Sequence, residues 1–184
     1  MKYILLAIFT LCLHASALAS PEMKRLFTDT FNSNYKPADC YYNIVRFLDL
    51  AEKSKININN ANILYITNEG TSMFGHVRAE HTRGRNGPED RNWYFHAVLE
   101  MDGLVYDYDF GITPRVVSVH EYFKVMFLSE KEPAVRDFRF IGPERKKEDY
   151  EIKIIDGLTE LRNRSTRGAP VGVKVKLGEF LKRF

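Results

Sequence analysis

The chain has 184 residues, which is long enough for one domain with a sizeable hydrophobic core. Its formal net charge of +3 is too small to indicate binding to nucleic acid or general binding to membranes, and we expect neither partner. Toward the C-terminus a group of basic side chains fits a solvated surface better than a phosphate or lipid contact: Arg162, Arg164, Arg167, Lys174, Lys176, Lys182 and Arg183.

The N-terminus has the pattern of a secretory signal peptide. Lys2 gives a short basic start, residues 3–13 form a continuous apolar run, and Ala17-Leu18-Ala19 fits the small-x-small rule of signal peptidase. The run is shorter than the ~20 residues of a membrane span, so an uncleaved anchor is the weaker interpretation. We predict that residues 1–19 are removed, and that the mature chain from Ser20 is exported to the periplasm or beyond without stable membrane insertion.

Export would leave Cys40 as the only cysteine, because Cys12 lies in the predicted signal peptide. One cysteine cannot form an internal disulfide, so Cys40 is either a small buried apolar residue or a functional free thiol. Asp39 is a suitable N-cap, and apolar residues recur after it at helical spacing, at Ile44, Val45, Leu48 and Ala51. The pattern predicts a helix over 39–55 with Cys40 in its first turn, where unpaired N–H groups and the helix dipole favour the thiolate.

The segments on either side of this helix are less distinctive. Residues 25–34 predict a weak helix or an extended arm, and the apolar residues of 62–68 predict a strand. A long polar connection follows over 69–91, with room for a short strand over 73–77. It contains His76 and His81, but no second cysteine is available to them in the mature chain, so we do not expect a zinc site there.

The stretch Trp93–Phe110 predicts a β-hairpin with Asp102-Gly103 as its two-residue turn. Alternation of side chains puts Tyr94, His96, Val98 and Glu100 on one face of the first arm, opposite Trp93, Phe95, Ala97 and Leu99. On the second arm Val105, Asp107 and Asp109 share a face, opposite Tyr106, Tyr108 and Phe110. With Met101 opposite Leu104, His96 lies opposite Asp109 and diagonal to Asp107, so either acid can orient the imidazole. A histidine beside an aspartate is also common as a satisfied surface pair.

The rest of the chain predicts an extended segment over 114–119, a helix over 119–128, a strand over 151–155, a loop over 165–172, an edge strand over 173–177 and a short C-terminal helix. No Pro/Gly/Ser linker or repeat divides the chain. We therefore predict one α+β domain over 20–184, with a central antiparallel sheet and the Cys40 helix packed against it. A thiolate at a helix start, a histidine and an acid are the parts of a cysteine hydrolase, with Cys40, His96 and either Asp107 or Asp109 in these roles.

Several short motifs, taken in order, carry a resemblance. Cys40-Tyr-Tyr-Asn43 at a helix start, the strand ILYITNEG, Trp93-Tyr-Phe-His96 and Val105-Tyr-Asp107-Tyr-Asp109 resemble the protein N-terminal glutamine amidohydrolase family. The resemblance runs over about 38–150, includes Phe138-Arg-Phe-Ile-Gly-Pro143, and leaves the extension from about 151 unassigned. It implies a papain- and transglutaminase-like fold in which Cys40 is the nucleophile, His96 the base and Asp107 the orienting acid.

The implied reaction is deamidation of a glutamine side chain through a thioester, without a metal or organic cofactor. The expected partner is a protein or peptide with an accessible glutamine, with N-terminal glutamine as the first choice. We expect Tyr41, Asn43, Trp93 and Asp109 to contact this substrate. The export signal and the Tyr41-Tyr42 pair depart from the family pattern. A papain-like protease, a transglutaminase and a catalytically inactive secreted binding module remain alternatives.

Overall fold

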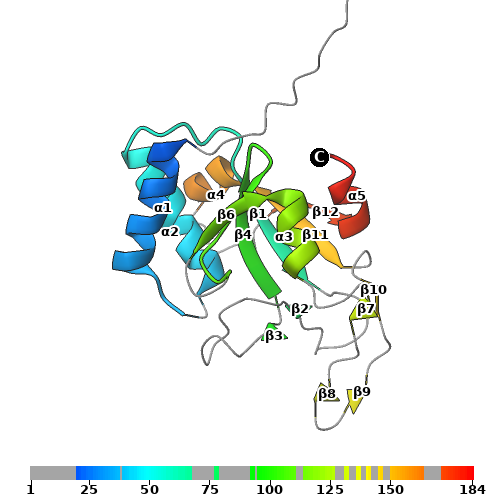
Figure 1. The fold of residues 1–184 in the computed structure, drawn as a ribbon. Coiled ribbons are helices and arrows are strands. Elements are labelled where there is room, and N and C mark those ends of the chain that lie inside the picture. Colours follow the sequence, from blue (N-terminus) through cyan, green and yellow to red (C-terminus); the bar gives the residue numbers. More distant parts are fainter. Residues whose placement is uncertain are drawn as a thin grey trace, which may run out of the picture.

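The computed structural model of the chain (Figure 1) describes residues 20–37, 39–67, 95–110, 114–126, 150–163 and 171–184, and the backbone of three short two-stranded ribbons. The ribbons pair β2 (Val77–Arg78) with β3 (Asn92–Trp93), β7 (Lys131–Glu132) with β10 (Arg145–Lys146), and β8 (Arg136–Asp137) with β9 (Phe140–Ile141). The predicted signal peptide, most of the 69–91 connection with His76 and His81, most of the loop over 165–172 and most of the motif over 138–143 lie outside the described residues.

A six-stranded antiparallel sheet forms the centre of the fold. Its order is β12 (Val173–Lys176), β11 (Glu151–Asp156), β1 (Asn62–Thr67), β4 (Phe95–Met101), β5 (Leu104–Asp107) and β6 (Arg115–Ser118). The predicted α+β class with a central antiparallel sheet is confirmed. The segment from 151, to which the family resemblance assigns no role, supplies β11 and the edge strand β12, as predicted over 151–155 and 173–177, and β11 pairs directly with the central strand β1.

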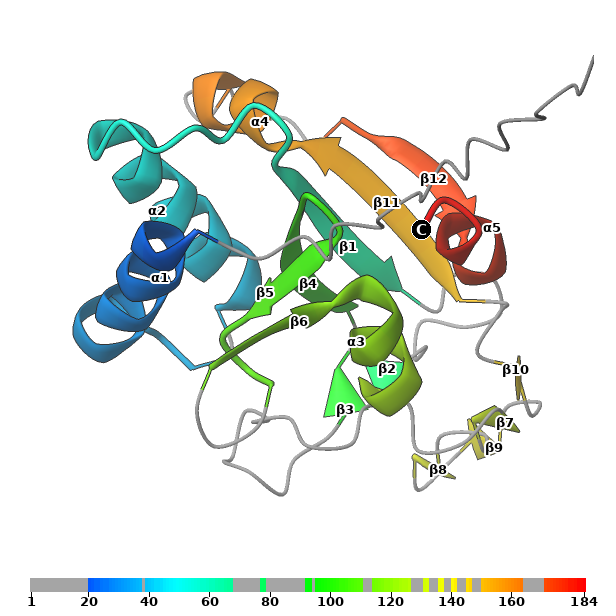
Figure 2. The ribbon, with the colours of Figure 1, turned by 45° about the horizontal axis from the view of Figure 1, so that its top comes forward.

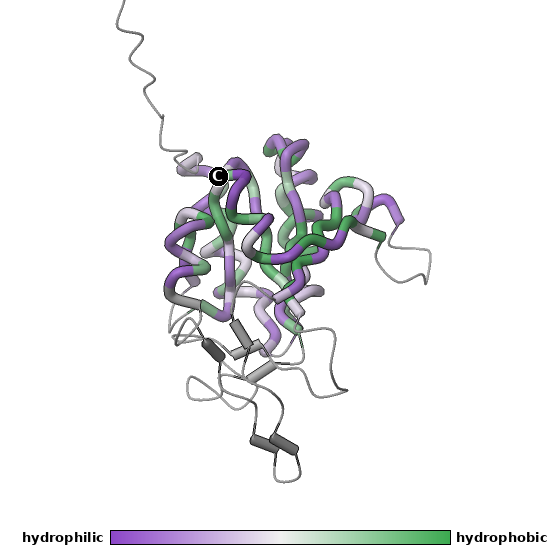
Figure 3. Tube along the Cα trace, turned by 90° about the vertical axis from the view of Figure 1, so that its right-hand side faces the viewer, coloured by the Kyte–Doolittle hydropathy of each residue, from purple (hydrophilic) through white to green (hydrophobic). Residues whose placement is uncertain are grey.

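Helices cover both faces of the sheet (Figure 2). On one face lie α1 (Pro21–Asn34), α2 (Cys40–Lys53) and α4 (Gly157–Asn163); on the other lie α3 (Val119–Met126) and α5 (Leu177–Leu181). Alternate residues of β4 enter the two cores, with Ala97 and Leu99 facing α2 and Val98 facing α3. Hydrophobic and hydrophilic residues alternate along the helices in Figure 3, as expected for helices with one buried side.

Two helices differ from the prediction. α1 is a full helix that starts at Pro21, four residues before the predicted arm, because the Ser20 hydroxyl caps it by accepting from the Met23 N–H at 3.1 Å. Buried Met23 and Phe27 then fix it to the sheet. α4 was not predicted; it is short and follows β11 without a break, and Asp156 caps its first turn by accepting from the Thr159 N–H at 2.7 Å.

The end of α2 contains a strained residue. The helix ends at Lys53, two residues before the predicted end, and Lys55 then adopts a left-handed conformation with φ of 60°. The Ile56 N–H reaches back to the Ala51 carbonyl at 3.0 Å, which is the helix ending that glycine usually makes. In this conformation the Cβ of Lys55 is sterically strained, which would not apply to a glycine.

The hairpin has the predicted turn and register. Asp102 and Gly103 both have positive φ, and Met101 lies opposite Leu104 with Leu99 opposite Tyr106. The predicted alternation holds through Tyr108, which shares the core of Tyr106, and fails at Phe110, because residues 108–109 form a turn. Phe110 therefore enters the core under α3 together with Val105, instead of sharing a face with Tyr106.

Candidate functional site

Cys40 opens the helix α2, as predicted. Asp39 holds the N-cap position through its carbonyl, which accepts from the Asn43 N–H at 2.8 Å, while its side chain makes no capping hydrogen bond. Cys40 is a free thiol and only 8% exposed. Cys40 lies in the first turn of α2, whose N–H groups have no partner within the helix.

His96 and Asp107 meet inside the protein. His96 Nε2 lies 2.9 Å from Asp107 Oδ2, and the two side chains are 0% and 2% exposed. The contact joins β4 to the end of β5 in the diagonal arrangement that the hairpin register predicts. Because both residues are buried, they do not form the exposed surface pair that was the alternative interpretation of the sequence.

Cys40 completes the group. Its thiol is near enough to the His96 ring to contribute to the raised pKa of that ring, and since Nε2 is directed at Asp107, Nδ1 is the ring nitrogen that does not face the acid. Burial by itself lowers the pKa of His96, but the Asp107 carboxylate and then the Cys40 thiol raise that pKa well above its ordinary value. The arrangement therefore favours the imidazolium form of His96.

Two tyrosines that the sequence analysis did not single out hold the acids. The Tyr122 hydroxyl of α3 donates to Asp107 Oδ2 at 2.8 Å, and the Tyr35 hydroxyl at the end of α1 donates to Asp109 Oδ1. The Asp109 N–H also donates to Asp107 Oδ1 at 2.8 Å. The predicted helix over 119–128 includes Tyr122. Nothing in the sequence pairs the hydroxyl of Tyr122 or Tyr35 with an acid.

The residues predicted to bind substrate fall into different environments. The Asn43 amide is buried and holds the backbone of Lys36, donating to its carbonyl at 2.7 Å and accepting from its N–H at 3.0 Å. Asn43 therefore supports the loop before Cys40, and its geometry does not favour a substrate contact. The Tyr41 hydroxyl donates to Glu160 of α4, and Asp109 is buried beside Asp107. Trp93 has a described backbone in β3, but its side chain lies outside the described residues.

A metal is the other chemistry that these side chains allow. His96, Asp107 and Asp109 each offer a ligand atom within 4.8 Å of the other two. Imidazole and carboxylate suit several divalent metals. Each carboxylate, however, already accepts a tyrosine O–H, and Asp107 also accepts a backbone N–H. Carboxylates that accept these hydrogen bonds are less suited to coordinate a cation. The expectation that the site holds no metal stays a prediction.

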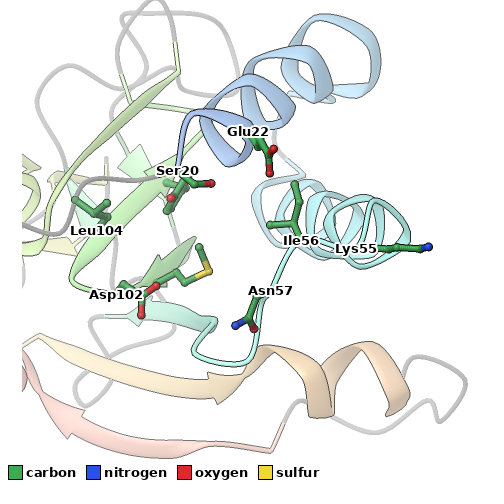
Figure 4. A pocket seen from close by; sticks show the side chains of 9 residues that line it. Ser20, Glu22, Lys55, Ile56, Asn57, Asp102 and Leu104 are labelled. Atoms are coloured by element: carbon green, nitrogen blue, oxygen red, sulfur yellow. The ribbon is translucent and has the colours of Figure 1, made fainter.

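A separate pocket of about 370 Å³ lies at the other end of α2, beside the turn of the hairpin (Figure 4). Ser20, Glu22 and Asp102 contribute polar groups to it, and the Lys55 ammonium points away from the other labelled side chains. The residues that line it include none of Cys40, His96 and Asp107. Within the described part of the chain, none of the helices has the length and apolar character needed to cross a bilayer.

The chain has no match among protein-family models and none among curated proteins. The geometry of Cys40, His96 and Asp107 is therefore the observation on which a function can be argued.

Proposed function

We propose that the protein is a cysteine-dependent amidohydrolase that removes ammonia from glutamine side chains through a thioester. The observation that carries the proposal is the buried His96 ring, which contacts Asp107 through Nε2 and has Cys40 near enough for its thiol to raise the pKa of the ring. This is the relation of nucleophile, base and orienting acid that acyl transfer requires. The papain- and transglutaminase-like fold remains part of the proposal.

The reaction follows from these positions. The Cys40 thiolate attacks the carboxamide carbon, and N–H groups at the start of α2 are suited to stabilise the oxyanion. The His96 imidazolium gives its proton to the leaving nitrogen, so ammonia departs and a thioester forms. His96, now neutral, takes a proton from water as the water attacks the thioester. The acid product then leaves, and the thiolate–imidazolium pair is restored.

Glutamine is the proposed substrate because of the order and identity of the motifs around Cys40, His96 and Asp107. The same group of residues would give a transglutaminase if an amine replaced the water, and a protease if a peptide bond replaced the side-chain amide. The export signal predicts that the substrate is met outside the cytoplasm.

Mass spectrometry of a peptide panel tests the proposal. Peptides with glutamine first or internal are incubated with the protein from Ser20 onward and with Cys40→Ala, with a chelator in a parallel arm. A gain of about one mass unit that requires Cys40 and survives the chelator supports deamidation. A chain cut or an amine adduct would assign the protease or the transglutaminase instead. Inhibition by the chelator would favour the metal interpretation, and an inert Cys40 thiol without turnover would favour the binding module.

A further inference from the structure

Both oxygens of the buried Asp107 carboxylate take part in hydrogen bonds. Its Oδ1 accepts the Asp109 N–H at 2.8 Å. Its Oδ2 lies 2.9 Å from His96 Nε2 and also accepts the Tyr122 hydroxyl at 2.8 Å. Two of these three donors belong to the hairpin itself, and Tyr122 is the one that comes from another element.

Tyr122 is firmly placed and stays protonated. It is 0% exposed, and the centroid of its ring lies 5.3 Å from that of Phe110 and 5.1 Å from that of Phe123. The start of α3 is fixed as well, since the Val119 N–H donates to the Gly103 carbonyl at 3.0 Å. Burial, and then the nearby carboxylate of Asp107, raise the pKa of Tyr122 well above its ordinary value. The hydroxyl is therefore a permanent donor at physiological pH.

We infer that Tyr122 is a positioning residue that acts on Cys40 through Asp107 and His96. Its hydroxyl holds the Asp107 carboxylate in one rotamer. Asp107 then keeps the proton of the imidazole on Nε2 and turns Nδ1 toward the thiol. The inference rests on the proposed function for its catalytic meaning, but the effect of Tyr122 on the His96 ring follows from the hydrogen bonds alone.

Tyr122→Phe tests this with little risk to the fold, because the phenyl ring keeps the contacts with Phe110 and Phe123. Tyr106→Phe is the matched control: Tyr106 is also 0% exposed, lies on the same strand as Asp107, and its hydroxyl has no hydrogen-bond partner among the described residues. Both variants are measured by nitrogen NMR of the His96 ring, by the rate of Cys40 alkylation with iodoacetamide, and by kcat and KM on a glutamine peptide.

We expect Tyr122→Phe alone to change the ring-nitrogen shifts of His96 and to lower kcat about tenfold with KM unchanged, because one hydrogen bond to a charged group is lost. In an Asp107→Asn background, adding Tyr122→Phe should slow alkylation no further.

Unchanged His96 shifts in Tyr122→Phe, or equal changes in Tyr106→Phe, would overturn the positioning role whatever the activity. An additive effect in the Asp107→Asn background would do the same, because it would mean that Tyr122 acts by another route. If the wild-type protein shows neither rapid alkylation nor turnover, the proposed function fails, and the NMR comparison still decides whether Tyr122 orients the ring.

Discussion

The two buried aspartates of the site, Asp107 and Asp109, should respond very differently to the same change. In Asp107→Asn the group facing His96 loses its charge, and either orientation of the amide breaks a contact. With the amide nitrogen toward His96, the ring must accept at Nε2 and takes the wrong tautomer. With the amide oxygen toward His96, the NH2 group takes the place of Oδ1, which accepts the Asp109 N–H at 2.8 Å in the wild-type protein. Two donors then face each other.

The loss of a hydrogen bond to a charged, buried partner is worth about 3 kcal/mol, which corresponds to roughly 100-fold in rate. Asp109→Asn keeps an oxygen that can accept from Tyr35 and leaves the contact between His96 and Asp107 untouched. We expect Asp107→Asn to lower kcat by about 100-fold or more, and Asp109→Asn to lower it less than about tenfold.

Stopped-flow alkylation of Cys40 near about pH 6 and turnover of a glutamine peptide measure both variants, with thermal unfolding as the check on folding. A larger loss in Asp109→Asn would refute the assignment of Asp107 as the orienting acid. A loss of less than about threefold in Asp107→Asn would refute the need for any orienting acid.

Three further outcomes are expected. Cys40→Ala and His96→Ala should each abolish turnover, and the double variant should be no worse than either, because the two residues act as a unit; residual Cys40-independent turnover would contradict this. The raised pKa of His96 means that the folded protein keeps a proton that the unfolded chain releases. The stabilisation from His96 should therefore be complete below about pH 6.5, the ordinary pKa of histidine, and should be lost as pH rises through the raised pKa. Urea unfolding over that range should show the fall, and Asp107→Asn should flatten it. Lys55→Gly should raise the free energy of unfolding by about 0.5–1 kcal/mol by relieving the positive φ, whereas Lys55→Ala should not; equal effects in urea would rule out the strain.

The parts of the site that local rules fix could be predicted from the sequence. A two-residue Asp102-Gly103 turn determines the register of the hairpin, and the register places Asp107 diagonal to His96. The Cys40 helix follows from the helical spacing of the apolar residues after Asp39, which takes the N-cap position although its side chain makes no capping hydrogen bond. Both predictions depend on residues close together in the chain.

The partners of the site could not be predicted, because they come from distant segments. Tyr35 and Asp109 are 74 residues apart, and Tyr41 and Glu160 are 119 apart. Helical spacing can show that Tyr122 is buried, but it cannot show which polar group its hydroxyl meets. The position of β11 beside β1 is also invisible in the sequence, since a short alternating strand fits many places in a sheet.

The meeting of Cys40 and His96 depends on where the strands end. Side-chain alternation turns His96 toward the α3 face of the sheet, while α2 packs on the opposite face. β4 begins at Phe95, but its pairing with β5 reaches only as far as Leu99. His96 is therefore paired with β1, and the chain that leaves β5 turns away at 108–109. The first turn of α2 can therefore bring Cys40 around the end of β5 to a histidine on the other face. A longer β5 would separate the two layers. The turn at 108–109 carries Phe110 from one core to the other, and the same turn allows the thiol of the α2 layer to approach His96, whose partner Asp107 accepts from Tyr122 of the α3 layer.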